Sequence, residues 1–239
     1  MTESIIPEPR SNGPRWHALP DATALDDDAE TRILAAAQAA IATHDRFDVV
    51  LAGGTTPRGA YRLLRTADAD WSRWHVWYGD ERCVPSGAIE RNSRMAGDAW
   101  LDHVAIPPNQ VHVIPAERGP RAAARAYAEY LRGAGPFDLV LLGLGEDGHT
   151  ASLFPGHDWG TAADAPDVLA VFDAPKPPPQ RVSLSAARLG RARAVLFLVD
   201  GETKRDAIAR WRTGENIPAA AIRPRAGVDV LIVDPSASC

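Results

Sequence analysis

Short apolar runs alternate with longer amphipathic stretches along most of this chain. The apolar runs have the length of buried strands, and they cover residues 47–51, 74–78, 111–114, 137–142, 181–185, 194–199 and 228–233. The amphipathic stretches predict helices over residues 21–44, 57–64, 92–103, 121–131 and 202–212. Strands that alternate with helical segments are typical of βαβ units. We therefore predict a three-layer α/β/α fold of Rossmann-like type, with a mostly parallel twisted sheet and helices on both faces.

The alternation continues too regularly to indicate a domain boundary. Residues 15–239 are expected to form a single α/β domain, preceded by a flexible arm over residues 1–14, which hold three prolines and little apolar material. Residues 155–180 form a second proline-rich stretch, which we expect to be mostly loop. A stiff surface connector is the simpler interpretation of this stretch, and a mobile lid is the alternative.

Composition excludes several classes of function. The formal net charge of −5 and the pI of about 5.8 do not favour nucleic-acid binding. No apolar run approaches the ~18 residues of a membrane helix, and no signal peptide is recognisable, so we expect a cytoplasmic protein without a membrane partner. Two cysteines, Cys83 and Cys239, are too few for a disulfide framework or a zinc site, and no His-x-x-x-His pair or acidic calcium loop occurs. We therefore expect no metal.

Arginine supplies almost all of the positive charge. Of the 26 basic residues, only Lys176 and Lys204 are lysines. Genomic base composition is the simplest explanation of this bias. A lysine kept in such a background can nevertheless indicate a position that needs a compact point charge.

The most distinctive stretch follows the apolar run 137–142, where three glycines precede a histidine. It reads Gly143-Leu144-Gly145-Glu146-Asp147-Gly148-His149-Thr150-Ala151-Ser152-Leu153-Phe154-Pro155-Gly156. Because ligands bind at the carboxyl ends of parallel strands, we expect His149 to face a ligand. An ordinary histidine pKa near ~6.5 suits a general base at neutral pH. Asp147 is expected either to orient His149 or to cap the turn. We do not expect Ser152 to be a nucleophile, because the Gly-x-Ser-x-Gly elbow is absent.

Two other predicted strand ends carry residues that suit an anion. Gly53-Gly54-Thr55-Thr56-Pro57 lies between a strand and a helix, where glycines allow close approach and a helix N-terminus attracts phosphate. A plain tight turn with a threonine cap explains this block equally well. Asp80-Glu81-Arg82 follows the next strand, and an arginine fork can clamp a phosphate or carboxylate. A surface ion-pair cluster is the simpler interpretation of the bare triplet.

A cation near the start of the last predicted helix is unusual. Lys204 lies in Gly201-Glu202-Thr203-Lys204, and a positive charge in a first helical turn opposes the helix macrodipole. A phosphate partner would explain this lysine, whereas the simpler interpretation is an exposed side chain. Arg181, after the proline-rich stretch, is a weaker candidate for the same role.

Together these blocks resemble the 6-phosphogluconolactonase family. The stretch around His149 is similar to that family's Gly-x-Gly-x-Asp-Gly-His-x-Ala-Ser-Leu-Phe-Pro signature, and the Gly-Gly-Thr-Thr-Pro, Asp-Glu-Arg-Cys-Val-Pro and Gly-x-x-Lys blocks occur in the family's order. The resemblance covers roughly residues 15–234. One block departs, because Arg91-Asn92-Ser93 stands where the family usually has Ser-Asn-Tyr. The asparagine is common to both patterns, so Asn92 remains a site candidate.

The resemblance implies hydrolysis of 6-phospho-D-glucono-1,5-lactone to 6-phosphogluconate in the oxidative pentose phosphate pathway, without a cofactor. It implies that His149 is the general base that activates water, with Asp147 and Arg82 as further catalytic residues. The substrate-binding residues that it implies are Gly53, Gly54, Thr55, Thr56, Asp80, Asn92, Gly148, Arg181 and Lys204. The expected partner is a small sugar-phosphate lactone, and the protein is expected to be a monomer or a small homo-oligomer.

Two other functions fit part of the pattern. A glucosamine-6-phosphate deaminase would share the fold and two of the blocks, with Asp80 as the proton-abstracting base. Deaminases resemble Ile-Ala-Phe-Asn-Glu-Pro-Gly after the histidine, whereas residues 150–156 here read Thr-Ala-Ser-Leu-Phe-Pro-Gly. The second alternative is a non-catalytic sugar-phosphate-binding module, such as the effector domain of a repressor. Residues 1–20 are too short and too rich in proline for the helix-turn-helix of such a repressor.

Overall fold

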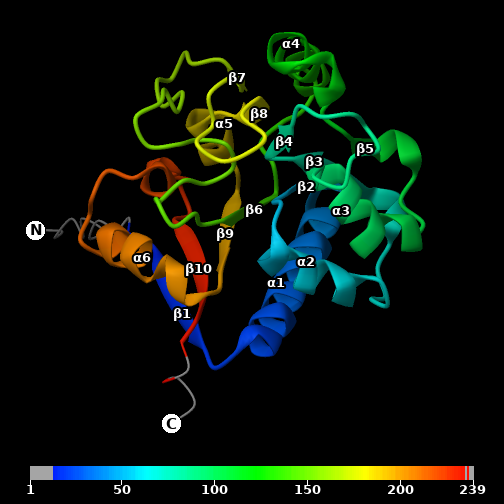
Figure 1. The fold of residues 1–239 in the computed structure, drawn as a ribbon. Helices are drawn as coiled ribbons and strands as arrows, with labels where there is room; N and C mark the ends of the chain where they lie inside the picture. The colour runs from blue at the N-terminus through cyan, green and yellow to red at the C-terminus, as the bar shows by residue number, and fades with distance from the viewer. Residues whose placement is uncertain (1–12, 235, 237–239) are drawn as a thin grey trace, which may run out of the picture.

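A seven-stranded parallel sheet forms the centre of the computed structural model, which describes residues 13–234 and residue 236 (Figure 1). The strand order is β1-β10-β9-β6-β2-β3-β5, and every neighbouring pair is parallel. The bounds are β1 Arg15–Leu19, β2 Phe47–Leu51, β3 Trp74–Tyr78, β5 Val111–His112, β6 Leu139–Gly143, β9 Ala194–Val199 and β10 Val228–Val233. The predicted parallel sheet is confirmed. The predicted arm, 1–14, lies almost wholly outside the described residues.

The sequence pattern missed β1, which is the edge strand of this sheet. Its five residues are half-buried or exposed, so they show no apolar run. An edge strand pairs on one side only, and β1 does so with β10 in register from Arg15 opposite Asp229 to Leu19 opposite Val233. The Arg15 guanidinium and the Asp229 carboxylate, 2.6 Å apart, reinforce that register.

A second, antiparallel sheet lies beside the first, in the order β4-β8-β7 (Figure 1). Its strands are β4 Asp80–Arg82, β8 Arg181–Leu184 and β7 Val168–Val171. The expectation that 155–180 is mostly loop overlooked β7, because only Val168 of its four residues is buried and prolines follow closely. Asp80–Arg82 follows β3 as predicted, and in addition these residues form a strand of their own that pairs with β8.

Helices cover both faces of the parallel sheet. They are α1 Ala22–His44, α2 Thr55–Leu64, α3 Asn92–Ala99, α4 Pro120–Leu131, α5 Ala186–Gly190 and α6 Arg205–Arg212. Short 3-10 turns span Trp71–Arg73, Leu101–His103, Pro108–Gln110, Ala116–Arg118, Glu202–Lys204 and Pro218–Ala221. Side chains alternate along a strand, so Trp74 and Trp77 of β3 point to opposite faces. Trp74 packs on Trp100, just after α3, with ring centroids 5.6 Å apart, and Trp77 packs on Tyr127 of α4 at 6.2 Å.

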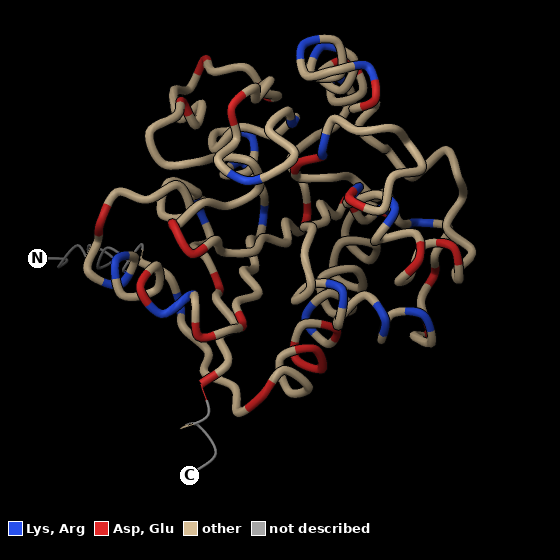
Figure 2. Tube along the Cα trace, in the orientation of Figure 1, with Lys and Arg blue, Asp and Glu red and all other residues tan. Residues whose placement is uncertain are grey.

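Local sequence explains the longest helix. Asp21 caps α1 by accepting the backbone N–H of Ala24 at 2.9 Å, and Asp45 ends it in a left-handed conformation with φ 60°. One stripe of α1 is buried in the core, and it consists of Leu25, Ala29, Ile33, Ala37 and Ala40. Acidic and basic residues are interspersed over the trace in Figure 2, and both signs occur in α1 and α4, whereas α2 carries only Arg58 and Arg62.

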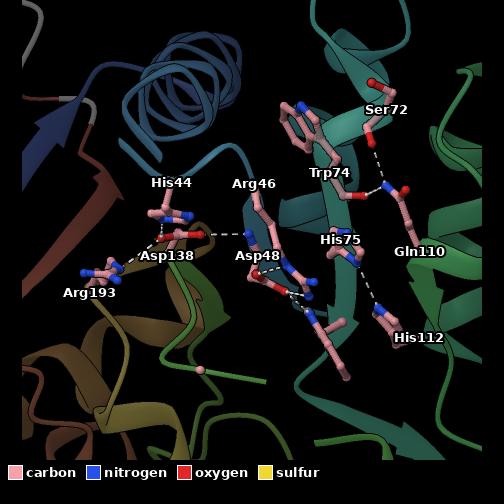
Figure 3. A network of polar contacts seen from close by, with 12 residues as sticks. His44, Arg46, Asp48, Ser72, Trp74, His75, Gln110, His112, Asp138 and Arg193 are labelled. Atoms are coloured by element: carbon pink, nitrogen blue, oxygen red, sulfur yellow. Dashed lines mark hydrogen bonds and ion pairs between the residues drawn. The ribbon is translucent and has the colours of Figure 1, made fainter. Parts of the chain in front are cut away.

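A network of polar contacts occupies the amino-terminal ends of the central strands (Figure 3). Asp138, just before β6, accepts from His44 Nε2 at 2.9 Å and from the backbone N–H of Asp48 at 2.8 Å. The imidazoles of His75 and His112 stack on neighbouring strands with ring centroids 5.6 Å apart. Asp48, His44 and Asp138 thus satisfy one another at this end of the sheet, whereas the carboxyl ends of the strands border a pocket.

Candidate active site

The carboxyl ends of four neighbouring strands border a pocket of about 350 Å³. These strands are β9, β6, β2 and β3, in that order across the sheet. Nine residues predicted from the sequence line the pocket: Gly53, Gly54, Thr55, Thr56, Asp80, Arg82, His149, Arg181 and Lys204. The fold thus brings five separate segments of the chain to one place.

Three predicted site residues do not line the pocket, namely Asn92, Asp147 and Gly148. Asn92 is buried behind the wall, where its Nδ2 donates to the backbone oxygen and to the carboxylate of Asp80, both at 2.9 Å. Gly53 leaves room for this amide, since a Cβ at Gly53 would lie 1.9 Å from Asn92 Oδ1. Asn92 therefore orients a residue of the pocket wall, and its contact with a substrate stays a prediction.

Asp147 fixes the imidazole of His149. Asp147 Oδ1 lies 2.5 Å from His149 Nδ1 and accepts the backbone N–H of His149 at 3.1 Å. Because an ionised carboxylate only accepts hydrogen bonds, Nδ1 carries the ring proton and Nε2 keeps its lone pair. One carboxylate thus combines the two roles weighed from the sequence, since it closes the turn and orients the ring.

The electrostatics of this pair favour a neutral imidazole. Burial lowers the pKa of His149 below its ordinary 6.5, the charge of Asp147 raises it, and the charge of Lys176 lowers it again, with a net lowering. Burial alone would raise the pKa of Asp147, but the hydrogen bonds and charge of His149 more than offset this, so that the pKa of Asp147 is lowered. At neutral pH a carboxylate therefore supports an unprotonated Nε2, which is the form that a general base needs.

Glycines hold the loop before His149 in a tight turn. Gly148 has φ +88°, and a Cβ on it would lie 2.9 Å from Ile217 Cβ. Gly145 lies against the imidazole, where a Cβ would be 2.0 Å from His149 Nδ1. The backbone N–H of Gly145 donates to the oxygen of His149 at 2.8 Å. The glycine pattern recognised in the sequence is thus a requirement for placing the histidine.

The N-terminus of α2 borders the pocket. The helix begins after Gly54, whose φ is 105°, and no side-chain hydrogen bond caps this end. Thr55 and Thr56, in its first turn, both line the pocket. The partial positive charge and the backbone N–H groups of a ten-residue helix therefore face the same space as His149.

Two arginines meet across the small sheet. Arg82 of β4 is the register partner of Arg181 of β8. Arg181 is buried, and its guanidinium donates to the backbone oxygens of Pro178 at 3.0 Å and Lys176 at 2.8 Å. Arg82 donates from Nη1 to the oxygen of Glu90 at 2.5 Å. Within the described part of the chain, Arg82 Nε is buried without a hydrogen-bond partner.

The proline-rich stretch contributes to the pocket, which sequence reasoning missed. Lys176 and Pro177 line it, and Lys176 Nζ lies 3.0 Å from Glu146 Oε1 on the loop after β6. Both lysines of the chain therefore border one pocket, with Lys204 on the 3-10 turn before α6. The scarcity of lysine is the one sequence signal that points to Lys176. Asp200, at the end of β9, also lines the pocket without having been predicted.

Ser152 does not line the pocket, so its position does not suit a nucleophile. Its side chain is buried, and its hydroxyl donates to Asp80 Oδ2 at 2.6 Å. The backbone N–H of Ser152 donates to the hydroxyl oxygen of Ser183 at 3.2 Å. The hydroxyl therefore helps to hold Asp80, together with Asn92.

Residues 13–234 and 236 contain no cluster of three or more His, Cys, Asp or Glu side chains placed to hold a metal ion. Over the same residues, no helix is both long enough and apolar enough to cross a membrane.

The fold and the pocket define an α/β protein with a neutral, carboxylate-supported histidine among several cations. The chain belongs to the 6-phosphogluconolactonase family, within the family described as "Glucosamine-6-phosphate isomerases/6-phosphogluconolactonase", whose model matches residues 20–231.

Relatives and solved structures agree with this membership. The 6-phosphogluconolactonase of Mycobacterium leprae is 40% identical over 210 residues, which cover 82% of this chain and 83% of the relative. The 6-phosphogluconolactonase of Mycobacterium tuberculosis is 39% identical over 219 residues, which cover 84% of this chain and 88% of the relative. The crystal structure of 6-phosphogluconolactonase from Thermotoga maritima matches with a TM-score of 0.85 and 28% identity, covering 92% of this chain and 99% of that one.

A monomeric glucosamine-6-phosphate deaminase also shares the fold. Its structure matches with a TM-score of 0.80 and covers 94% of this chain and 99% of that one, but the identity is 20%. Similarity at this level is evidence for the common fold alone. The 6-phosphogluconolactonase relatives, at 39–40% identity, decide between the two activities.

Proposed function

We propose that His149 is the general base in the 6-phosphogluconolactonase activity of this chain, which hydrolyses 6-phospho-D-glucono-1,5-lactone to 6-phosphogluconate in the pentose phosphate pathway. The observation that supports this role most directly is the 2.5 Å contact between His149 Nδ1 and Asp147 Oδ1. It leaves Nε2 unprotonated at a pocket of about 350 Å³, which is large enough for a phosphorylated sugar ring.

The reaction then proceeds in two proton transfers through one imidazole. His149 Nε2 takes a proton from water as the water oxygen attacks C1 of the lactone. Asp147 stabilises the imidazolium that forms. The bond from C1 to the ring oxygen then breaks, and the imidazolium gives its proton to that oxygen. The products are a free hydroxyl and a carboxylic acid, which ionises, and the base is regenerated. Such acid–base catalysis contributes typically ~10²–10⁴-fold.

The phosphate is assigned to the N-terminus of α2 and to Lys204. Both border the pocket, and the helix end has no side-chain cap. A dianion suits the partial positive charge of the helix, and it would also stabilise a lysine placed just before α6. This assignment leaves Arg82, Lys176 and Arg181 for the remaining oxygens of the substrate and for the oxyanion at C1.

Asp80 is the residue on which the deaminase alternative depends. Its carboxylate already accepts hydrogen bonds from Asn92 Nδ2 at 2.9 Å and from Ser152 Oγ at 2.6 Å. Each of the two carboxylate oxygens is thus already engaged by a donor of the protein itself. The arrangement therefore favours an orienting and charge-balancing Asp80 over a catalytic base.

Hydrolysis of freshly generated lactone by wild type and His149→Ala tests the proposal, with the spontaneous rate subtracted. We expect His149→Ala to fall to near the spontaneous rate. Ser152→Ala, the matched control, should stay within about tenfold of wild type, because no covalent intermediate is involved. A wild type no faster than the blank would refute the activity, and release of ammonia from glucosamine 6-phosphate would then be measured.

The remaining partner properties stay predictions. A small lactone as the only partner, a cytoplasmic location, and a monomer or small homo-oligomer are expected. Light scattering on the purified chain tests the last of these.

A further inference from the structure

A buried arginine lies directly behind Arg82. Arg91 immediately precedes α3, and its side chain is 1% exposed. It stands where the 6-phosphogluconolactonase pattern usually has serine, and no role for it follows from the mechanism above. A buried guanidinium is costly unless its charge and its donors are matched. The partners of Arg91 therefore show what it stabilises.

The first partner of Arg91 is Glu81, the middle residue of β4. Arg91 Nε lies 3.2 Å from Glu81 Oε2, and both side chains are 1% exposed. Glu81 also accepts the backbone N–H groups of Arg82 at 2.8 Å, Asn92 at 2.7 Å and Ser93 at 2.8 Å. Glu81 thus joins the strand that carries Arg82 to the start of α3, and Arg91 neutralises this joint.

The remaining donors of Arg91 join the loop between β4 and α3 to the segment after β5. Nη1 donates to the oxygen of Val84 at 3.2 Å, and Nη2 donates to the oxygen of Ile114 at 2.8 Å. Nη1 also contacts the partly exposed carboxylate of Glu117 at 3.3 Å. The planar fork therefore ties Val84, at the start of the segment 84–91, to Arg91 at its end and anchors both on Ile114. A lysine with its single point charge could not make these contacts together.

The segment 84–91 also provides the acceptor for the Arg82 guanidinium. Arg82 Nη1 donates to the backbone oxygen of Glu90 at 2.5 Å, and Glu90 is the residue before Arg91. We propose that Arg91 is a positioning residue that sets the place of the Arg82 guanidinium in the pocket by fixing the Glu90 carbonyl and the Glu81 carboxylate. This proposal rests on the proposed function only in taking Arg82 as a substrate-binding cation.

A double-mutant cycle in full-length protein tests this role, because residues that act through one another show non-additive effects. The variants are Arg91→Lys, Arg82→Ala and the pair. We expect Arg91→Lys to lower kcat/KM about fivefold or more in the wild-type background but less than about twofold when Arg82 is already alanine. Arg94→Lys on the same helix is the matched control, since Arg94 is exposed and pairs with Asp98, and it should leave activity unchanged.

Equal losses in both backgrounds would overturn the proposal, because they would indicate a general structural effect. Wild-type activity of Arg91→Lys would overturn it as well. Thermal unfolding checks that each variant is folded at the assay temperature, and Arg91→Gln replaces Arg91→Lys if the latter is not.

A failure of the proposed function is distinguishable from a failure of the positioning role of Arg91. An inactive wild type would refute the activity, and the same cycle would then be measured as affinity for 6-phosphogluconate by calorimetry. Additive losses of affinity would overturn the positioning role, and non-additive losses would support it.

Discussion

Replacing Asp147 with asparagine separates the charge that supports His149 from the shape of the turn. Asparagine keeps an oxygen that can accept the backbone N–H of His149, which Asp147 accepts at 3.1 Å. It loses the charged partner of the ring, which lies 2.5 Å away. A hydrogen bond to a charged group contributes about 1.5–3 kcal/mol, which corresponds to roughly 10- to 150-fold in rate. Because 34% of the Asp147 side chain is exposed, solvent screens part of this charge, and we expect a loss of about 10-fold in kcat.

The same substitution has a second signature in the pH profile. Burial lowers the pKa of His149 below 6.5, and Asp147 is a contribution that raises it. A base is lost as pH falls through its pKa, so the acid limb of kcat/KM in wild type should lie below 6.5. Without Asp147 the pKa falls further, and the limb should move to lower pH while the plateau drops.

The assay is initial-rate hydrolysis of fresh lactone between about pH 4 and about pH 8, with the spontaneous rate subtracted at each pH. Asp206→Asn is the matched control, because this carboxylate is 79% exposed on α6 and should change neither the plateau nor the limb. An unchanged plateau for Asp147→Asn, or a limb that moves to higher pH, would refute the reasoning.

Three further tests, which use four substitutions, address separate parts of the structure. Gly145→Ala places a Cβ 2.0 Å from His149 Nδ1, so kcat should fall about 100-fold while the protein stays folded, as judged by its Tm; near-normal kcat would contradict the geometry. Lys176→Ala should raise KM about tenfold. Glu146→Gln should leave KM equal or lower it, because it removes an anion that competes for Lys176. A raised KM in both variants would indicate that their ion pair holds the loop instead. Burial lowers the pKa of His112 from 6.5 to about 4, so the unfolded chain binds this proton more readily and the free energy of unfolding falls as pH drops through that range. Denaturant unfolding of His112→Gln should show a weaker fall in this free energy than wild type. An equal fall would exclude this histidine as a cause.

The parallel sheet could be predicted from the sequence because its strands are buried on both faces. Residues 47–51 and 194–199 are nearly continuous apolar runs, and they became β2 and β9. The strands that escaped prediction lack such a run. β1 is a half-exposed edge strand, and β7 buries only Val168. A pattern of apolar residues reports burial, so it cannot report a strand that is held mainly by backbone hydrogen bonds and cross-strand ion pairs.

The loops of the pocket could be predicted where a chemical signature lies within a few residues. The glycines before His149 and the Gly-Gly-Thr-Thr block are of this kind, and the structure brings both to one pocket. Lys176 could not be placed in the same way, because two contacts determine its position. Its side chain pairs with Glu146, which is 30 residues away in the sequence. Its backbone oxygen accepts from Arg181, on the far side of a run of prolines. Sequence spacing carries no information about such contacts.

The small antiparallel sheet shows why the cations of the pocket need an anion. Its register sets Arg82 directly opposite Arg181, and like charges at opposed positions destabilise a sheet. Burial lowers the pKa of Arg181, the charge of Asp80 opposes this, and the neighbouring Arg82 guanidinium lowers the pKa further. Backbone oxygens accept three hydrogen bonds from the Arg181 guanidinium but bring no full negative charge. The strand pairing thus concentrates positive charge at the pocket at a cost to stability. A bound phosphorylated substrate would relieve this repulsion, so its affinity should fall as salt screens the pocket.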